Sequence, residues 1–518
     1  MSPSAQISTS VPATTIPTKV MASSSKKATS CACNCSSDAA TTSQAIQVQP
    51  SRFLSAAAKA RPPSAIRSLF PAELIPGMLS LLAGKPNPTT FPIAEISMTL
   101  KPDAVDGMGE DGQGKKLEIK GKDLETALQY GYTSGTVSTL KWLTDFQSRV
   151  HGREIVNQGD KLDGVAGRTP WRITIGVGSQ DLLNKAFEAL VNPGDVVLVE
   201  SPVYTGILPS LEMLKAKIVP IESDSEGLSS VELAKILAEW GTTPLTKGLA
   251  APKLLYTTPT GANPAGTTAS DQRKREVLKL AREYDFMIME DDPYYYLSFE
   301  GLGQDPVTRT RSRCYWSLEE EGREVYGTGR VLRFESFSKI LAAGLRLGFA
   351  TGPEEILEAI DMHTAMANLQ PSGVAQAVAQ RLFDHWGVEG FLRHVDQVAS
   401  FYEKRRDNFE EKARRILGEV AEWVTPVAGM FLWLKLKLPP SAEGDDQGDS
   451  FALISERAKA AGVLAVPGMA FMPRGDKTCY VRTSFSLIEE ENVEEAFQRL
   501  RGVILDAWKE SGLELNPL

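Results

Sequence analysis

The feature that most constrains the fold is an alternation of short apolar runs with helical patterns from about residue 170 to residue 340. The apolar runs cover residues 171–175, 195–200, 253–257, 286–290 and 331–335. Continuous apolar runs are typical of strands buried on both faces, and the helices between them form the crossovers of a parallel sheet. We therefore predict an α/β fold with a mainly parallel sheet, whose ligands bind beyond the carboxyl ends of the strands.

The pattern changes after about residue 380. A long charged helix is predicted from 395 to about 416, followed by strand-like runs and a closing helix from 489 to about 508. This order of elements indicates a smaller α+β domain. The predicted organisation is a disordered tail over 1–48, an N-terminal arm with part of the small domain over 49–125, the large domain over 126–380, and the C-terminal small domain over 381–518.

The tail is predicted because residues 1–48 are rich in Ser, Thr and Ala and contain few large apolar side chains. Three further stretches are short of large apolar residues and rich in charge or glycine, namely 103–120, 301–326 and 441–450. We expect these three stretches to be surface insertions.

Composition argues against several classes of function. A net charge of -9 over 518 residues argues against phosphate-driven nucleic-acid binding, and no apolar stretch approaches the roughly 20 residues that span a bilayer.

The five cysteines, with Cys31, Cys33 and Cys35 in one cluster, favour reduced intracellular thiols over a disulfide framework. That cluster has no partner cluster to complete four ligands and the four histidines form no metal-binding pair, so no metal site is predicted. The expected partners are small molecules.

The N-terminal residues bear on the compartment. Lys19, Lys26 and Lys27 precede the first acidic residue, Asp38, a bias that mitochondrial presequences share. No arginine precedes Arg52, and the segment has no clear amphipathic face. The expected compartment is the cytoplasm, with mitochondrial import as the alternative.

Ser179 and Gln180 stand where a predicted strand gives way to a helix. Free backbone N–H groups at the start of a helix, beside a hydroxyl and an amide side chain, favour a dianionic phosphate. The alternative at this position is an ordinary serine N-cap.

Two other strand ends carry polar groups. The turn 256–266 is dense in proline and glycine and projects the amide of Asn263, although a tight loop alone would look the same. Asp291 is the middle one of three successive acids after an apolar strand, with Tyr294 close by. A buried carboxylate requires a cation or a proton donor, and a protonated pyridine nitrogen is such a partner. The alternative is a solvated acidic loop.

Lys339 follows another predicted strand, with Ser336, Ser338 and Arg346 around it. A lysine becomes a nucleophile when its neighbours lower its pKa, and a Schiff base to an aldehyde is its characteristic covalent product. Arg346 can pair with phosphate oxygens through two N–H groups, and the two serines can add neutral donors.

Taken in order, these motifs resemble the fold-type I pyridoxal-phosphate enzymes, specifically the class I/II aminotransferases. The closest likeness is to the group of fungal aromatic aminotransferases and 2-aminoadipate/kynurenine aminotransferases. The resemblance runs from about residue 80 to the C-terminus and is also carried by residues 83–88, 128–135, 201–204, 426–433 and 480–486. Ala265 and Ala343 depart from the family pattern, where threonine and proline are frequent, but both are small replacements outside the chemistry.

The resemblance implies a fold and a cofactor. The fold would be type I, with a mainly parallel seven-stranded sheet in the large domain, and the cofactor would be pyridoxal 5'-phosphate. Lys339 would carry the cofactor as a Schiff base and later move the proton between substrate and cofactor. Asp291 would hold the pyridine nitrogen protonated, and Tyr294 and Asn263 would hydrogen-bond the phenolate oxygen of the ring.

The remaining implied roles concern the ring face, the phosphate and the substrate. Tyr204 would stack on the ring, with a half-buried core tyrosine as the alternative. The phosphate would be held by Ser179, Gln180, Ser336, Ser338 and Arg346. Tyr130 would reach the phosphate in the partner subunit of a homodimer. Arg482 would bind the substrate α-carboxylate, with a strand-edge ion pair as the alternative, and Gly84 would contact substrate from the N-terminal segment.

The expected function is transfer of the α-amino group of an aromatic amino acid (Tyr, Phe or Trp), or of a related one such as 2-aminoadipate or kynurenine, to a 2-oxo acid, with 2-oxoglutarate as the expected acceptor. Two alternatives remain at this stage. One is a different pyridoxal-phosphate reaction on the same scaffold, such as a β-lyase or decarboxylase. The other is a cofactor-binding regulator, although residues 1–80 offer no basic helix-turn-helix pattern.

Overall fold

The computed structural model describes residues 48–82, 84–155, 168–440 and 448–515. The predicted tail therefore lies outside the described residues except for Val48, which is buried. The Cys31, Cys33 and Cys35 cluster and most of the predicted 441–450 insertion also lie outside them.

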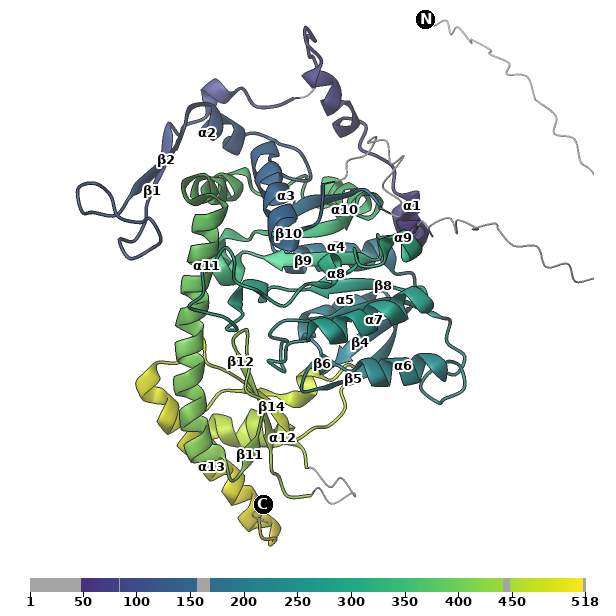
Figure 1. Cartoon of the computed structure of the whole chain (residues 1–518), viewed down its shortest axis with the longest axis vertical. Helices are drawn as coiled ribbons and strands as arrows, with labels where there is room; N and C mark the ends of the chain where they lie inside the picture. Colours follow the sequence, from purple (N-terminus) through teal and green to yellow (C-terminus); the bar gives the residue numbers. More distant parts are fainter. Residues whose placement is uncertain (1–47, 83, 156–167, 441–447, 516–518) are drawn as a thin grey trace, which may run out of the picture. The chain divides into compact units, whose positions relative to one another are not determined.

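The large sheet has eight strands in the order β3-β10-β9-β8-β7-β4-β5-β6 (Figure 1). The strands are β3 (Trp171–Gly176), β4 (Val196–Ser201), β5 (Lys217–Asp224), β6 (Gly227–Leu228), β7 (Pro252–Thr257), β8 (Met287–Asp291), β9 (Val331–Ser336) and β10 (Gly348–Pro353). Strand β10 runs antiparallel to both of its neighbours, β6 runs antiparallel to β5, and the other pairs are parallel. The mainly parallel sheet is thus confirmed. The resemblance implied seven strands and the structure has eight, of which β6 has only two residues.

Helices cover both faces of this sheet, as predicted. One face packs against α3 (Val137–His151), α6 (Ser230–Ala238), α7 (Asp271–Glu283), α8 (Tyr315–Leu318) and the start of α11. The other packs against α1 (Ala56–Ala60), α4 (Ser179–Leu190), α5 (Leu208–Met213) and α10 (Glu354–Ala367). Side chains alternate along each strand, so Ile288 belongs to the first core and Met287 and Met289 to the second.

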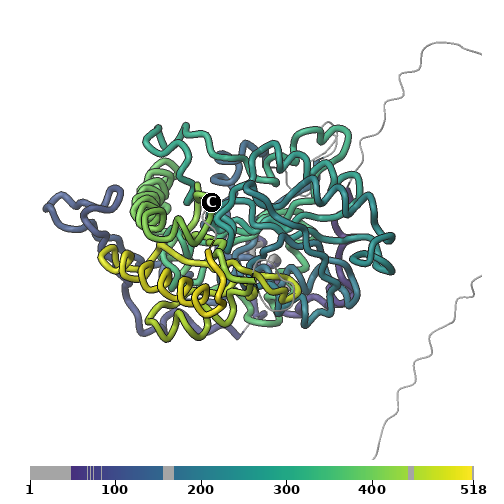
Figure 2. Tube along the Cα trace, turned by 90° about the horizontal axis from the view of Figure 1, so that it is seen from below, coloured from purple at the N-terminus to yellow at the C-terminus, as the bar shows by residue number. Residues whose placement is uncertain are grey.

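The long helix α11 (Gly373–Leu417) leads to the small sheet, and the expected domain boundary at 380/381 falls within this helix. The small sheet is antiparallel in the order β11 (Ala421–Glu422), β12 (Phe431–Leu436), β14 (Tyr480–Ser484) and β13 (Val466–Pro467). Figures 1 and 2 show the closing helix α13 (Glu490–Ser511) beside α11, and the short α12 (Ser450–Ala452) precedes β13. The predicted α+β character of this region is confirmed.

Residues 103–120 belong to a hairpin outside both sheets. Strand β1 (Glu95–Thr99) pairs with β2 (Lys116–Lys120) in antiparallel fashion, and helix α2 (Gly121–Leu128) follows directly.

The predicted surface insertion 301–326 is wrong in its second half, which ends with α9 (Arg323–Tyr326). Tyr315 and Trp316 in helix α8 are fully buried, and their backbone N–H groups donate to the buried carboxylate of Glu290. Part of the charge that suggested a surface is neutralised inside the protein, because Glu319 pairs with the buried Arg153, and Arg309 and Arg311 in the first half pair with Asp396. The density of charged residues alone therefore does not show that this segment lies at the surface.

Within the part of the chain that the structure describes, no helix combines the length and apolarity needed to cross a bilayer. The same residues contain no cluster of three or more histidine, cysteine or acidic side chains placed to hold a metal ion.

Candidate active site

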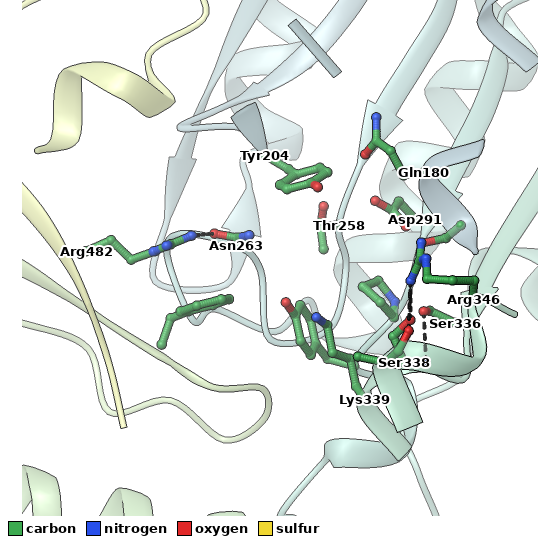
Figure 3. Close-up of a pocket in the computed structure, with 15 residues that line it drawn as sticks. Gln180, Tyr204, Thr258, Asn263, Asp291, Ser336, Ser338, Lys339, Arg346 and Arg482 are labelled. Atoms are coloured by element: carbon green, nitrogen blue, oxygen red, sulfur yellow. Dashed lines mark hydrogen bonds between the residues drawn. The ribbon is translucent and has the colours of Figure 1, made fainter. Parts of the chain in front are cut away.

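A cavity of about 360 Å³ lies at the carboxyl ends of the parallel strands and also reaches the small sheet. It is lined by Ser179, Gln180, Tyr204, Thr258, Asn263, Asp291, Pro293, Tyr294, Ser336, Ser338, Lys339, Ala343, Arg346, Phe431 and Arg482. Every predicted site residue except Tyr130 and Gly84 is in this set. Figure 3 shows Arg482 and Asn263 at one side of the cavity and Arg346 with the two serines at the opposite side.

The serine side of the cavity is built for an anion. Ser179 begins helix α4, whose first backbone N–H groups have no partner within the helix. Gly178 precedes it with φ +88°, and a Cβ there would lie 2.5 Å from an Arg346 nitrogen, so only glycine allows the guanidinium this close. Arg346 itself has φ +52° and donates to Ser338 Oγ and to the carbonyl of Val177. This strained backbone aims a cation at the start of the helix.

The side-chain amide of Gln180 already has a partner within the chain. Its Nε2 donates to the carbonyl of Gly206 at 2.8 Å, which ties the helix start to the loop that carries Tyr204. Its backbone N–H, in the first turn of α4, is the group positioned to bind a phosphate.

Lys339 lies in the π-helical turn Ser338–Ala342 directly after β9. Burial lowers the pKa of its amine, the nearby Arg346 cation lowers it further, and the Asp291 carboxylate acts in the opposite direction. A lowered pKa increases the fraction of neutral, nucleophilic amine, which is the form that attacks an aldehyde.

Asp291, at the end of β8, is fully buried with an incomplete set of partners. Its Oδ2 accepts a hydrogen bond of 2.6 Å from the hydroxyl of Tyr256, while Oδ1 has no partner. Burial raises the pKa of the carboxyl to about 7, although the Tyr256 hydrogen bond acts to lower it. An unpartnered buried carboxylate oxygen in a cavity is suited to a cationic N–H donor from a ligand.

The two cavity tyrosines stay protonated. Burial and the nearby Asp291 carboxylate raise the pKa of both Tyr204 and Tyr294 above the ordinary value. Tyr294 also packs edge-to-face on Phe431, with ring centroids 5.9 Å apart. Both hydroxyls can therefore serve as hydrogen-bond donors, and both rings offer apolar surface.

Arg482 reaches the cavity from strand β14 of the small sheet. One guanidinium nitrogen donates to Asn263 Oδ1 at 2.8 Å, and the guanidinium carbon lies 4.4 Å from the ring centroid of Phe431 and 5.0 Å from that of Phe471. No carboxylate forms an ion pair with Arg482 among the described residues. A fixed arginine without an internal counter-ion is suited to binding a carboxylate ligand through two N–H groups.

Two predicted residues do not reach the cavity within one chain. Tyr130 is half exposed and lines a separate cavity of about 490 Å³. Gly84 is exposed, and a Cβ added to it would meet no other atom within 4 Å.

Four cavity residues, Thr258, Pro293, Ala343 and Phe431, were not among the predicted site residues. Thr258 directly follows the predicted strand 253–257 and Pro293 lies three residues after the predicted strand 286–290, so their positions could have indicated them. Ala343 is a small residue that the sequence analysis placed outside the chemistry. Phe431 lies in an apolar strand, where nothing distinguishes it from a core residue.

Pyridoxal phosphate fits these residues. The start of α4 and Arg346 are suited to binding its phosphate, and the amine of Lys339 is suited to reacting with its aldehyde. The unpartnered oxygen of Asp291 is suited to accepting a hydrogen bond from its pyridine nitrogen. The arginine at the far side adds a position for a substrate carboxylate.

Comparison with known proteins identifies the family. The family described as "Aminotransferase class I and II" matches residues 130–500. Aminotransferase tdiD of Emericella nidulans is 43% identical over 444 residues, which are 85% of this chain and 93% of that protein. The mitochondrial kynurenine/alpha-aminoadipate aminotransferase of Bos taurus is 36% identical, covering 88% of this chain and 99% of the relative. The chain belongs to the class I and II aminotransferases and is a pyridoxal-phosphate-dependent enzyme.

Solved structures agree with this assignment. The chain resembles aminotransferase Aro8 from Candida albicans with a TM-score of 0.75 and 25% identity, over 90% of this chain and 100% of that one. It also resembles the aromatic aminotransferase Aro9 from the same organism, with a TM-score of 0.74 and 27% identity over the same shares. The predicted fold type I is confirmed.

Proposed function

We propose that this aminotransferase moves the α-amino group of an aromatic amino acid, or of a related one such as 2-aminoadipate or kynurenine, to a 2-oxo acid, with 2-oxoglutarate as the acceptor. The observation that carries this proposal is Arg482, held by Asn263 across the cavity from Lys339. It marks where an α-carboxylate binds, and the rings of Tyr204 and Phe431 beside it form an apolar lining for a bulky side chain.

The names of relatives support the aromatic donor. The relatives include kynurenine/alpha-aminoadipate aminotransferases of mammals and an aromatic amino acid aminotransferase of Schizosaccharomyces pombe that is 30% identical over 90% of this chain. The neighbouring solved structures include an aromatic aminotransferase and a kynurenine aminotransferase from Pyrococcus horikoshii.

The proposed roles follow from the positions of the side chains. When bound, pyridoxal phosphate supplies an aldehyde for the amino group and a protonated ring that withdraws electrons. Lys339 would hold the aldehyde through its amine and would move the proton at the substrate α-carbon. Asp291 accepts a hydrogen bond from the ring nitrogen. Tyr294 and Asn263 donate to the phenolate oxygen, and Tyr204 covers one ring face and helps to exclude water.

The phosphate is proposed to bind at the start of α4. The hydroxyls of Ser179, Ser336 and Ser338, the backbone N–H of Gln180 and the guanidinium of Arg346 converge there. The charge of Arg346 and the positive end of the helix both stabilise a dianion.

We also propose a homodimer with shared active sites. Large apolar side chains are exposed between residues 66 and 137, and Leu79 and Leu81 are almost wholly so. An apolar surface of this kind is typical of a protein–protein interface. The proposal accounts for Tyr130, which lies outside the cavity of its own chain and would reach the phosphate bound by the second copy. Gly84, in the same N-terminal region, stays a prediction as a substrate contact.

The dimer proposal has a direct test by subunit mixing. Lys339→Ala and Tyr130→Ala homodimers should each be nearly inactive. Hybrids should regain activity, because one of their two sites combines an intact Lys339 with the intact Tyr130 of the other copy. Mixing without recovery would contradict shared sites.

The donor proposal is tested by turnover of a panel of amino acids with 2-oxoglutarate. Tyr, Phe, Trp, kynurenine or 2-aminoadipate should be the best donors, and Lys339→Ala should remove both turnover and the visible absorbance of the lysine-bound cofactor. Release of ammonia or carbon dioxide in place of amino transfer would indicate a lyase or decarboxylase. Cofactor binding without turnover of any amino acid would indicate a regulator.

The cytoplasmic compartment stays a prediction, because it depends on residues outside the described part of the chain. Imaging of the full chain with a C-terminal fluorescent tag separates cytoplasm from mitochondrion.

A further inference from the structure

Tyr256 is a buried residue of strand β7 that the reaction scheme above does not use. It lies on the same sheet face as Asp291 because alternate residues of neighbouring parallel strands share a face, and its backbone partner across the strand pair is Met289. Its hydroxyl is 2.6 Å from Asp291 Oδ2, and both side chains are buried.

The direction of this hydrogen bond is fixed. Burial and the adjacent Asp291 carboxylate raise the pKa of Tyr256 well above its ordinary value, so the hydroxyl keeps its proton and donates. The bond occupies one carboxylate oxygen and leaves Oδ1 without a partner. Tyr256 therefore determines which oxygen of Asp291 is available in the cavity.

The same hydrogen bond affects whether the Asp291 carboxyl is ionised or protonated. A donor to a carboxylate stabilises its ionised form, whereas burial and the like charge of Asp292 favour the protonated form. The cations of Arg333 and Lys339 also stabilise the ionised form, but neither donates a hydrogen bond to Asp291 in the described structure. Among the groups that favour the ionised form of Asp291, Tyr256 is thus the one that donates a hydrogen bond to it.

We propose that Tyr256 is a positioning residue that keeps Asp291 ionised and correctly oriented, so that the proton between Asp291 and the cofactor stays on the pyridine nitrogen. This proposal rests on the assignment of Asp291 to that nitrogen. The proton equilibrium N–H⁺···⁻O–C against N···H–O–C conserves one proton, and the Tyr256 hydroxyl shifts it towards the first form. A hydrogen bond to a charged acceptor changes such an equilibrium by roughly ten- to a hundredfold.

The chain offers a matched control in Tyr296. Its hydroxyl is also buried but has no hydrogen-bond partner within the described residues, and burial likewise raises its pKa well above the ordinary value. Tyr296→Phe removes the same atom as Tyr256→Phe from a similar environment without touching Asp291.

The test is nitrogen NMR of the holoenzyme loaded with pyridoxal phosphate labelled with ¹⁵N in the ring. The wild type and Tyr296→Phe should give the resonance of a protonated pyridine. Tyr256→Phe should move the resonance towards the unprotonated position and lower kcat about tenfold with a smaller change in KM. A resonance in Tyr256→Phe that matches the wild type would overturn the proposal.

Two further arms keep the outcomes separate. If Asp291→Asn also leaves the resonance unchanged, the assignment of Asp291 to the ring nitrogen is wrong, whereas a shift there and none in Tyr256→Phe contradicts only the role of Tyr256. Should Tyr256→Phe not fold, 3-fluorotyrosine at position 256 keeps the ring and makes the hydroxyl a stronger donor. It should raise the pH at which the ring nitrogen loses its proton in a titration of the resonance, and an unchanged midpoint would contradict the proposal.

Discussion

Successive carboxylates at the end of strand β8 have different partners on the two faces of the sheet. On one face Glu290 and Asp292 pair with the fully buried guanidinium of Arg333, at 3.2 and 2.8 Å. On the other face Asp291 has only the Tyr256 hydroxyl and keeps one oxygen unpartnered. When buried charges are matched within the chain, removing one partner destabilises the fold, whereas a buried charge left partly unmatched can bind a ligand.

This difference follows from the period of two in a strand. Three acids in a row cannot all face the same side, so the middle one points to the cavity and its neighbours to the core beneath Tyr295 and helix α8. The paired face should therefore control stability, and the unpaired face should control catalysis.

The largest expected effect comes from breaking the paired face. Arg333→Met leaves Glu290, Asp292 and Glu335 without their shared cation and should lower the free energy of unfolding by about 3–5 kcal/mol. The deficit should shrink at lower pH, where the carboxyls protonate. Urea denaturation measures it, with Arg501→Met, whose ion pair is exposed, as a control expected to change by less than about 1 kcal/mol. Equal stabilities of the two variants would contradict the contrast between the faces.

Changing the unpaired face should affect rate and not folding. Asp291→Asn should reduce kcat/KM on the order of a thousandfold, because an amide cannot hold the ring nitrogen protonated. The cofactor-free variant should be at least as stable as the wild type, since a buried carboxyl that lacks a charged partner is removed. Steady-state kinetics and thermal melting check both parts; activity within tenfold of the wild type would refute this role.

The small-sheet side of the cavity should discriminate substrate. Arg482→Ala should reduce kcat/KM about a hundredfold through loss of the carboxylate contact, and Arg482→Lys should recover only part of it because ammonium lacks the planar fork. The absorbance of the bound cofactor should be retained in both variants. Arg474→Ala, an exposed arginine near the same sheet, serves as a control. If KM for the amino acid is unaffected in Arg482→Ala, the carboxylate binds elsewhere.

The smallest expected effect is on pH dependence. The pKa of Asp291 is raised to about 7 by burial, so between the unfolded value and 7 the folded protein binds more protons than the unfolded chain. The contribution of this carboxyl to the free energy of unfolding is therefore fully present at low pH and is lost as pH rises through 7. The loss amounts to about 1 kcal/mol between pH 6 and pH 8. Urea denaturation at several pH values should show that the free energy of unfolding of cofactor-free Asp291→Asn falls less between pH 6 and pH 8 than that of the wild type, by this amount. The same pH dependence in both proteins would mean that Asp291 is already ionised at pH 6.

Most of the fold could be predicted from the sequence because its strands are buried on both faces. A continuous apolar run such as 286–290 is compatible with few structures other than a buried strand, and the five strands expected from such runs lie close to the observed β3, β4, β7, β8 and β9. Strands β5, β6 and β10 were not predicted, since β6 has only two residues and β5 and β10 are interrupted by polar residues, proline or glycine. In 301–326 the arginines Arg309 and Arg311 are paired inside the protein with Asp396, an acid distant in sequence.

The site was predictable where residues follow strands. Ser179, Asn263, Asp291 and Lys339 each stand at a strand end, and these ends meet at one edge of the sheet. The partner of Asp291 was not predictable, since Tyr256 lies within an apolar strand and its role depends on the pairing of β7 with β8.

The attachment of pyridoxal phosphate to Lys339 can be measured directly. Reduction of the holoenzyme with borohydride fixes the cofactor to the lysine that binds it, and peptide mass spectrometry then locates the added mass. We expect the label on the peptide containing Lys339 and its absence from the Lys339→Ala variant. A label on another lysine, or persistence of the label in that variant, would contradict the assignment.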